Sequence, residues 1–186
     1  MKNLAIFASG SGTNFEAIAQ ACADGVIDAR VALMVCDKPG AAVVGRAERF
    51  GVESFVFTPR SYASKADYEK EIVSRLADAK VDLVCLAGYM RIVGDVLLEA
   101  YGGCIINIHP ALLPSFKGAH GIRDAFEYGV KVFGVTIHYV DATLDGGRII
   151  AQRGFEYYGD DIDEVEARIH AIEHQLYPET INKLLK

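Results

Sequence analysis

Short apolar runs alternate with longer amphipathic stretches through the first half of this chain, and that alternation constrains the fold more than any other feature. Strand-like runs lie at residues 4–8, 29–37, 54–57 and 81–88, and helix-like stretches at 13–25, 41–51 and 64–80. Strands that alternate with helices are typical of a parallel sheet with helical crossovers. The uninterrupted apolar run at 81–88 also indicates a strand that is buried on both faces.

The pattern changes in the second half. We expect a short helix at 95–101, a strand at 104–108, a helix at 122–128 and strands at 132–140 and 148–158. The turn residues DATLDGG between the last two strands favour a hairpin or meander over a crossover. A final helix is expected at 160–185, bent or interrupted at Pro178. The predicted fold is α/β: a Rossmann-like, doubly wound, mostly parallel sheet with helices on both faces and antiparallel additions towards the C-terminus, in one domain of residues 1–186.

Composition excludes several classes of function. A formal net charge of −6 provides no basic surface for nucleic acid. No apolar run is long enough for a membrane span or a signal peptide, so neither a membrane partner nor export is expected. The four cysteines lack CxxC and Cys/His spacing, which indicates buried free thiols rather than a metal site. We therefore predict a cytoplasmic protein that binds small molecules and no metal.

A glycine-rich turn, SGSGTN at residues 9–14, joins the first strand to the first helix. Its backbone N–H groups and hydroxyls would surround a helix N-terminus, which is an anion-binding arrangement. A dinucleotide-binding turn would have a small residue where Phe15 stands, although Asp37 after the second strand could contact a ribose. These residues leave three interpretations open: a site for one phosphate, a nicotinamide site, or a tight turn without a ligand.

Three polar residues of the second half form a candidate catalytic group. Asn107 and His109 are two positions apart at a strand end and would share one face, and Asp145 lies in the loop that ends in LDGG. An amide and a protonated imidazole can both stabilise an oxyanion, and a nearby carboxylate would raise the histidine pKa. Each residue could instead be structural, as a core histidine, a cap or a turn residue. Without a Ser-His or Cys-His pattern elsewhere, the group favours transfer to an amine that the substrate supplies.

The motifs SGSGTN, LAGYMRI, NIHPALLPSFKGAH and LDGG occur in this order, and with them the chain resembles the phosphoribosylglycinamide formyltransferases, folate-dependent enzymes of purine synthesis. The resemblance covers essentially all 186 residues. It implies transfer of the formyl group of 10-formyltetrahydrofolate to the amine of glycinamide ribonucleotide, giving formylglycinamide ribonucleotide and tetrahydrofolate. The sequence leaves the oligomeric state open between a monomer and a homodimer.

The resemblance further implies a role for each matching residue. The catalytic residues would be Asn107, His109 as proton donor and Asp145 as the group that raises the pKa of His109, supported by His138. The ribonucleotide would contact Gly12, Thr13, Asn14, His170, Ala171, Ile172 and Glu173. The folate would contact Lys65, Met90, Arg91, Ile92, Val93, Asn107, Asp141, Ala142, Thr143, Leu144 and Asp145.

Two of these positions depart from the family's usual residues, and one peptide bond is singled out. Thr13 stands where the family often has Ser, which keeps the hydroxyl. Lys65 stands where Arg is common, so a point charge replaces a planar fork. The bond between Leu113 and Pro114 is a candidate for the cis form.

Competing interpretations remain in two classes. Formyltetrahydrofolate deformylases resemble this catalytic core and discharge the formyl group to water, but they usually carry an N-terminal regulatory domain, and this chain starts at the first strand. Transformylases of initiator tRNA or nucleotide sugars usually add a C-terminal domain, and a tRNA substrate also conflicts with the acidic charge. The alternative from another class is a non-catalytic folate- or nucleotide-binding module, which would not need a charge-stabilised acid beside an amide. A nicotinamide-dependent oxidoreductase is disfavoured by Phe15.

Overall fold

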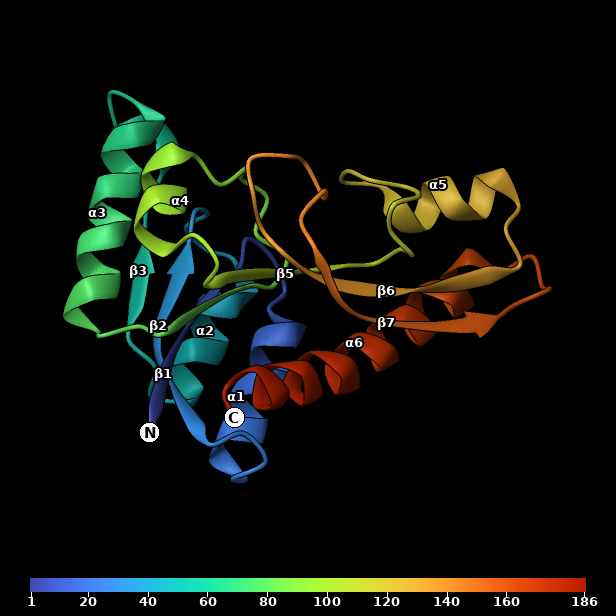
Figure 1. The fold of residues 1–186 in the computed structure, drawn as a ribbon, viewed down its shortest axis with the longest axis horizontal. Helices are drawn as coiled ribbons and strands as arrows, with labels where there is room; N and C mark the ends of the chain where they lie inside the picture. Colours follow the sequence, from blue (N-terminus) through green and yellow to red (C-terminus); the bar gives the residue numbers. More distant parts are fainter.

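The computed structural model describes residues 1–186, which form a mixed seven-stranded sheet covered by helices (Figure 1). The strands are ordered β3-β2-β1-β4-β5-β6-β7 across the sheet. The elements follow the chain as β1 (Lys2–Phe7), α1 (Thr13–Ala23), β2 (Ala29–Cys36), α2 (Ala42–Arg49), β3 (Ser54–Val56), the 3-10 helix η1 (Pro59–Ser61), α3 (Lys65–Asp78), β4 (Leu83–Leu86), α4 (Asp95–Tyr101), β5 (Ile105–His109), α5 (Gly121–Tyr128), β6 (Val132–Tyr139), β7 (Ile149–Glu156) and α6 (Ile162–Leu184).

The pairing of the strands confirms the predicted fold class. The first five strands pair in parallel, whereas β6 pairs antiparallel with β5 and β7 antiparallel with β6. The segment DATLDGG therefore joins a hairpin, as its turn residues predict. Only η1 has no counterpart among the expected elements. None of the helices has the length and apolar composition needed to cross a membrane.

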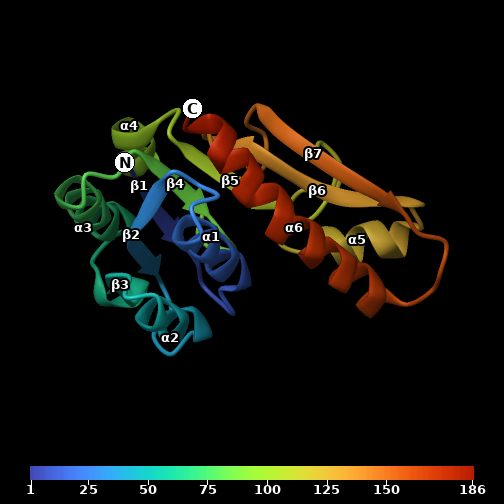
Figure 2. The ribbon, with the colours of Figure 1, turned by 90° about the horizontal axis from the view of Figure 1, so that it is seen from below.

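Alternating side chains of the central strands enter two cores on opposite faces of the sheet. In β1, Leu4 and Ile6 belong to one cluster, with residues of α1, α2, α5 and α6, and Ala5 and Phe7 to the other, with residues of α3 and α4. Successive side chains of a strand point to opposite faces, so a continuous apolar run serves both cores. Figure 2 shows α6 running along the sheet beside α1, as the shared cluster requires.

Of the expected bend or interruption at Pro178, the interruption does not occur, because α6 continues through it to Leu184. A proline removes one backbone donor and crowds the preceding turn. Here the neighbouring side chain holds the helix in place: Tyr177 is fully buried, and its hydroxyl donates to the carbonyls of Leu86 (2.9 Å) and Ile106 (3.3 Å). Tertiary contacts with the ends of β4 and β5 thus outweigh the local cost.

Two smaller expectations have different outcomes. The bond between Leu113 and Pro114 is cis, as predicted. All four cysteines are free thiols, and Cys36 and Cys85 are buried, but the expected burial is wrong for Cys104. That residue is exposed because it lies in the turn before β5 and not within the strand.

Candidate active site

A cavity of about 600 Å³ lies where the order of the strands reverses. From β1 the chain proceeds to β2 and β3 on one side, then returns to β4 and β5 on the other. Open α/β sheets bind ligands at such a switch point, outside the carboxyl ends of the strands. The segments that follow β1, β4 and β5 all line the cavity, at residues 10–14, 87–93 and 109–110. No three His, Cys, Asp or Glu side chains are grouped so that they could hold a metal ion.

The turn after β1 has the geometry of an anion-binding helix start. Gly12 adopts φ 76°, in the left-handed region, and precedes α1, whose first residue is Thr13. A Cβ on Gly12 would come within 2.5 Å of the Val43 side chain, so both the backbone angle and the available space require glycine. The N–H groups of the first helical turn are left for a ligand because no side chain caps this helix.

Asn107 and His109 lie on the same face of β5 and both line the cavity, as their spacing predicts. The antiparallel partner β6 places His138 directly opposite Asn107. Directly opposite residues project to one face, so the two side chains meet, with Asn107 Nδ2 at 3.2 Å from His138 Nε2. The pairing of β5 with β6 thus brings His138, the predicted supporting residue, into contact with Asn107.

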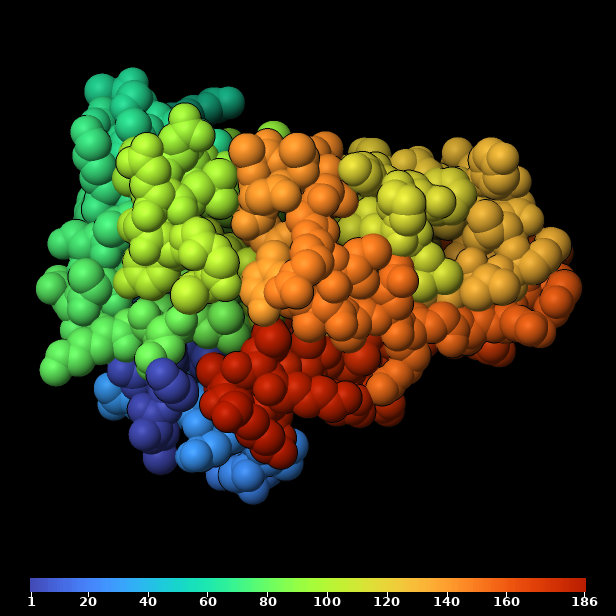
Figure 3. Space-filling view, viewed as in Figure 1, coloured from blue at the N-terminus to red at the C-terminus, as the bar shows by residue number.

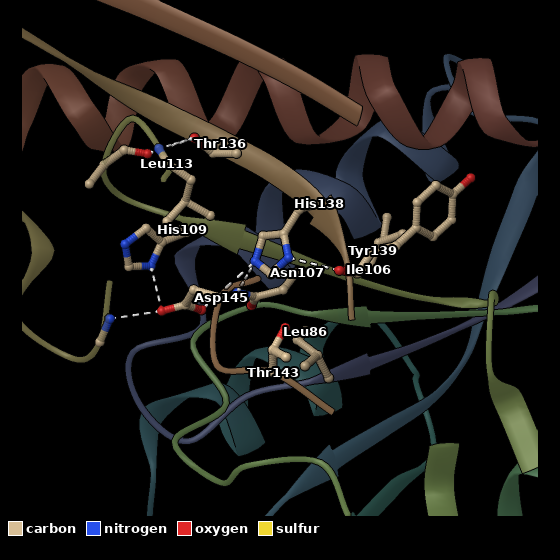
Figure 4. A network of polar contacts seen from close by, with 12 residues as sticks. Leu86, Ile106, Asn107, His109, Leu113, Thr136, His138, Tyr139, Thr143 and Asp145 are labelled. Atoms are coloured by element: carbon tan, nitrogen blue, oxygen red, sulfur yellow. Dashed lines mark hydrogen bonds and ion pairs between the residues drawn. The ribbon is translucent and has the colours of Figure 1, made fainter. Parts of the chain in front are cut away.

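Asp145 reaches this face from the loop between β6 and β7, and Figure 4 shows its carboxylate between the two imidazole rings. One oxygen is 3.6 Å from His109 Nδ1 and the other 3.8 Å from His138 Nε2. The backbone N–H of Gly118 donates to the same carboxylate at 2.8 Å. Asp145 has φ 47°, a left-handed conformation that aspartate tolerates better than most residues.

Both ring nitrogens of His109 face oxygen acceptors. Its Nε2 lies 2.7 Å from the carbonyl oxygen of Phe116, which can only accept, so Nε2 carries a proton. Its Nδ1 faces the carboxylate of Asp145, and a proton there turns that contact into an ion pair. The imidazole is 4% exposed, so little water screens this pair.

The two ring nitrogens of His138 have different roles, one as a donor and the other as an acceptor. Its Nδ1 donates to the carbonyl of Tyr139 at 2.8 Å, which leaves Nε2 as an acceptor for the Asn107 amide. Burial lowers the pKa of His138 below its usual value, although the hydrogen bond to Tyr139 and the charge of Asp145 act against that shift. The Asn107 amide thus has one donor directed at the His138 ring and the other free.

A third polar group enters the cavity from α6. The carboxylate of Glu173 is buried and accepts from Asn14 Nδ2 at 3.1 Å and from His170 Nδ1 at 2.9 Å. The hydrogen bond to Glu173 raises the pKa of His170, and burial acts against it. Ala171 is exposed and Ile172 packs against the core, and neither lines the cavity.

The remaining predicted residues lie on the segment after β4 and on the loop after β6. Met90, Ile92 and Leu144 line the cavity with side chains that are 67%, 65% and 55% exposed, whereas Val93 is buried. Arg91, Asp141 and Thr143 also line it. Figure 3 shows the loop after β6, in orange, at the surface beside α4. Ala142 and Lys65 are exposed and do not line the cavity, Lys65 being the first residue of α3.

Several contacts of the site have no signal in the sequence. The carbonyl of Phe116 and the N–H of Gly118 hold His109 and Asp145 through backbone atoms, which any residue could provide. Ser9, the first residue of the glycine-rich turn, donates its hydroxyl proton to Asp37. Asp37, which could have contacted a ribose, is 7% exposed and bonded to Ser9 and Arg91. It is therefore not available to bind the ribose of a nicotinamide cofactor, which disfavours that interpretation.

Comparison with known proteins shows that the chain is similar to formyl transferases. The formyl transferase family matches residues 2–181 of the chain. The phosphoribosylglycinamide formyltransferase of Bacillus subtilis (strain 168) is 52% identical over 186 residues, covering 100% of this chain and 95% of that protein.

Solved structures extend the similarity to the backbone. Glycinamide ribonucleotide transformylase 1 from Geobacillus kaustophilus is 52% identical, with a TM-score of 0.97 and 100% of both chains covered. The phosphoribosylglycinamide formyltransferase from Campylobacter jejuni subsp. jejuni NCTC 11168 is 34% identical, with a TM-score of 0.94, 100% of this chain and 98% of that chain covered. The fold is thus similar even where two thirds of the residues differ.

Proposed function

The chain belongs to the formyl transferase family, and from that premise we propose that it transfers a formyl group from 10-formyltetrahydrofolate to the amine of glycinamide ribonucleotide. The products are formylglycinamide ribonucleotide and tetrahydrofolate, a step of de novo purine synthesis. One observation carries the proposal: a single cavity is lined by a helix N-terminus for an anion, by Asn107, His109 and Asp145, and by exposed apolar side chains. Both halves of the chain contribute, so residues 1–186 would act as one formyltransferase domain.

The ribonucleotide half of the site would be the turn after β1 together with α6. The phosphate would accept hydrogen bonds from the N–H groups of Gly12, Thr13 and Asn14 at the start of α1. The buried carboxylate of Glu173 can accept from sugar hydroxyls, because an ionised carboxylate has four lone-pair positions and the two protein donors occupy only part of them. His170 would orient that carboxylate.

The folate half would be the segment after β4 and the loop after β6. The side chains of Met90, Ile92 and Leu144 expose apolar surface to the cavity, which suits the flat apolar body of a pteridine. Backbone groups of residues 90–93 and 141–145 would bind its polar edge. Lys65, exposed at the start of α3, would contact the anionic tail outside the cavity, and Ala142 would contribute only as part of the loop.

Asn107 and His109 would stabilise the negative charge that develops on the formyl oxygen when the amine attacks. The free donor of the Asn107 amide can bind that oxygen directly. Because Nε2 of His109 is held by the carbonyl of Phe116, Nδ1, which lies 3.6 Å from Asp145, would be the nitrogen that exchanges a proton with the reacting groups. The proton would then pass from the attacking to the leaving nitrogen, and no covalent enzyme intermediate is required.

A formyl-transfer assay tests this proposal. The purified protein is mixed with 10-formyltetrahydrofolate, and loss of the formyl group is followed with and without glycinamide ribonucleotide. We expect consumption only when the ribonucleotide is present, with formylglycinamide ribonucleotide formed in equal amount. Consumption that is independent of the amine would identify a deformylase, and binding of both compounds without consumption would identify a binding module.

A further inference from the structure

Asp37 is a buried carboxylate at the end of β2 with no part in the proposed chemistry. It does not line the cavity, and its side chain is 5% exposed. Both of its oxygens are nevertheless occupied: the hydroxyl of Ser9 donates to Oδ1 at 2.5 Å, and Nε of Arg91 donates to Oδ2 at 2.8 Å. A buried charge with two well-aligned donors is held in a fixed orientation.

Ser9 extends this arrangement to the backbone of the segment after β4. Its hydroxyl gives its only proton to Asp37 and accepts from the N–H of Met90 at 2.9 Å. Its own N–H donates to the carbonyl of Gly88 at 3.0 Å. The hydrogen bonds therefore run in one direction, from Met90 through Ser9 to Asp37, and each strengthens the next.

The segment from Met90 to Ile92 has few other anchors. The side chains of Met90 and Ile92 are 67% and 65% exposed, and that of Arg91 is 47% exposed, so burial does not fix their positions. Tyr89 and Val93 on either side are buried. Between those two residues, the contacts with Ser9 and Asp37 are the polar links from this segment to the sheet.

Ser9 also directly precedes the turn at residues 10–14, so one group of contacts joins the two halves of the cavity. We propose that Asp37 is a positioning residue, which sets the affinity for the formyl donor by holding Met90 and Arg91 against the end of β1. This inference rests on the proposed function, because it assigns residues 90–93 to the folate. Asp37 acts through Ser9 and Arg91 and touches neither substrate.

Steady-state kinetics of the variant Asp37→Asn test the proposal. The substitution keeps the size of the side chain and removes its charge, so that only one of the two donors can still find an oxygen. We expect KM for 10-formyltetrahydrofolate to rise about tenfold, the effect of weakening one charge-assisted hydrogen bond, with kcat and KM for the ribonucleotide within about twofold of wild type. A merely structural defect would instead lower the active fraction, which reduces kcat and leaves KM unchanged.

Asp82→Asn is the matched control. Asp82 also accepts from a backbone N–H, that of Asn3, at 2.8 Å, and from a cation, Lys2 Nζ, at 2.9 Å. It lies directly before β4, at the amino ends of the parallel strands and away from the cavity. The control should leave both KM values unchanged.

A double-substitution cycle with Arg91→Gln decides whether the two residues act through one contact. If they do, the Asp37→Asn/Arg91→Gln variant raises KM for the formyl donor by about tenfold, like the single variants, whereas independent residues would multiply to about a hundredfold. A large effect of Arg91→Gln with none from Asp37→Asn would place the guanidinium on the substrate and overturn the proposal, as would the multiplicative result.

A measurement without substrates separates this inference from the proposed function. Amide hydrogen exchange of Met90 should be about tenfold faster in Asp37→Asn than in wild type and unchanged in Asp82→Asn, because the acceptor of that N–H depends on Asp37. If the wild-type protein transfers no formyl group but the exchange result holds, the function is refuted and the positioning role stands. Unchanged exchange in Asp37→Asn refutes the positioning role whatever the activity.

Discussion

Replacing Asn107 by alanine tests the assignment of the oxyanion donor most directly. The Asn107 amide meets His138 Nε2 at 3.2 Å and is half-buried on β5. Losing one preorganised donor to an oxyanion typically lowers turnover by about 100- to 1000-fold, or about 2.7–4 kcal/mol of barrier. Because that interaction forms only in the transition state, kcat and kcat/KM should fall by the same factor.

Unfolding would not account for such a loss. Truncation of Asn107 breaks one neutral hydrogen bond, which costs about 0.5–1.5 kcal/mol of stability. Domains are typically stable by about 5–15 kcal/mol, so the variant would remain almost fully folded. Its Tm should fall by only a few degrees, since about 1 kcal/mol corresponds to roughly 2–4 °C in a chain of this size.

The assay is formation of formylglycinamide ribonucleotide at saturating concentrations of both substrates, with Asn3→Ala as control. Asn3 makes more hydrogen bonds than Asn107, to Arg30 Nε and to the carbonyls of Ala79 and Lys80, but lies on β1 away from the cavity. The control should lose more stability and keep its turnover. Near-normal turnover of Asn107→Ala would refute its role, and equal losses in both variants would refute the argument that the effect is local.

Three further substitutions have defined outcomes. Asp145→Asn keeps the shape of the loop but removes the charge between the two imidazoles, so kcat should fall by about 100-fold or more. Turnover near wild type across pH 5–9, a range that spans the usual histidine pKa of about 6.5, would contradict the role of that charge. Glu173→Gln should return the raised pKa of His170 towards about 6.5, observed by NMR titration of the ring. Because the pKa of His170 is raised in the folded protein, its contact with Glu173 stabilises the protein fully below about pH 6.5 and loses this effect as the pH rises through the folded pKa. The Tm difference between Glu173→Gln and wild type should therefore be larger at pH 6 than at pH 9. An equal difference at both pH values would show that the ion pair is unimportant. Gly12→Ala should cost about 1–2 kcal/mol of stability for the left-handed backbone angle alone and lower Tm by several degrees. Because the added Cβ also meets Val43, the turn should shift and KM for the ribonucleotide should rise. An unchanged KM would argue against phosphate binding at this turn.

Much of the fold follows from local patterns in the chain. The alternation of apolar runs and amphipathic stretches predicts the first four strands of a parallel sheet with the helices between them, because each pattern reflects which side of an element must be buried. The turn residues at 141–147 predict the hairpin of β6 and β7, since they restrict the backbone within a few residues. Pro178 shows the limit of local reasoning: its expected break does not form, because Tyr177 is anchored to the ends of β4 and β5.

For the candidate site, too, the sequence predicts some features and leaves others to the tertiary structure. Spacing alone places Asn107 and His109 on one face, and Gly12 marks a turn that only glycine fits. Lys65 matches a motif position, but the motif does not predict where its side chain lies, which is outside the cavity at the start of α3. The role of a residue at such a position depends on the direction of the helix that carries it, which the motif does not contain.

By itself, the sequence determined the α/β class, the glycine-rich turn after the first strand and the chemistry available at Asn107, His109 and Asp145, because these depend on residue types and short spacings. Only the tertiary structure decided that Asp145 lies between two histidines, that Nε2 of His109 meets the carbonyl of Phe116, and that Asp37 faces inward. These features depend on contacts between residues far apart in the chain, through backbone carbonyls and N–H groups that every residue has. A linear pattern cannot specify which of those groups a side chain will meet.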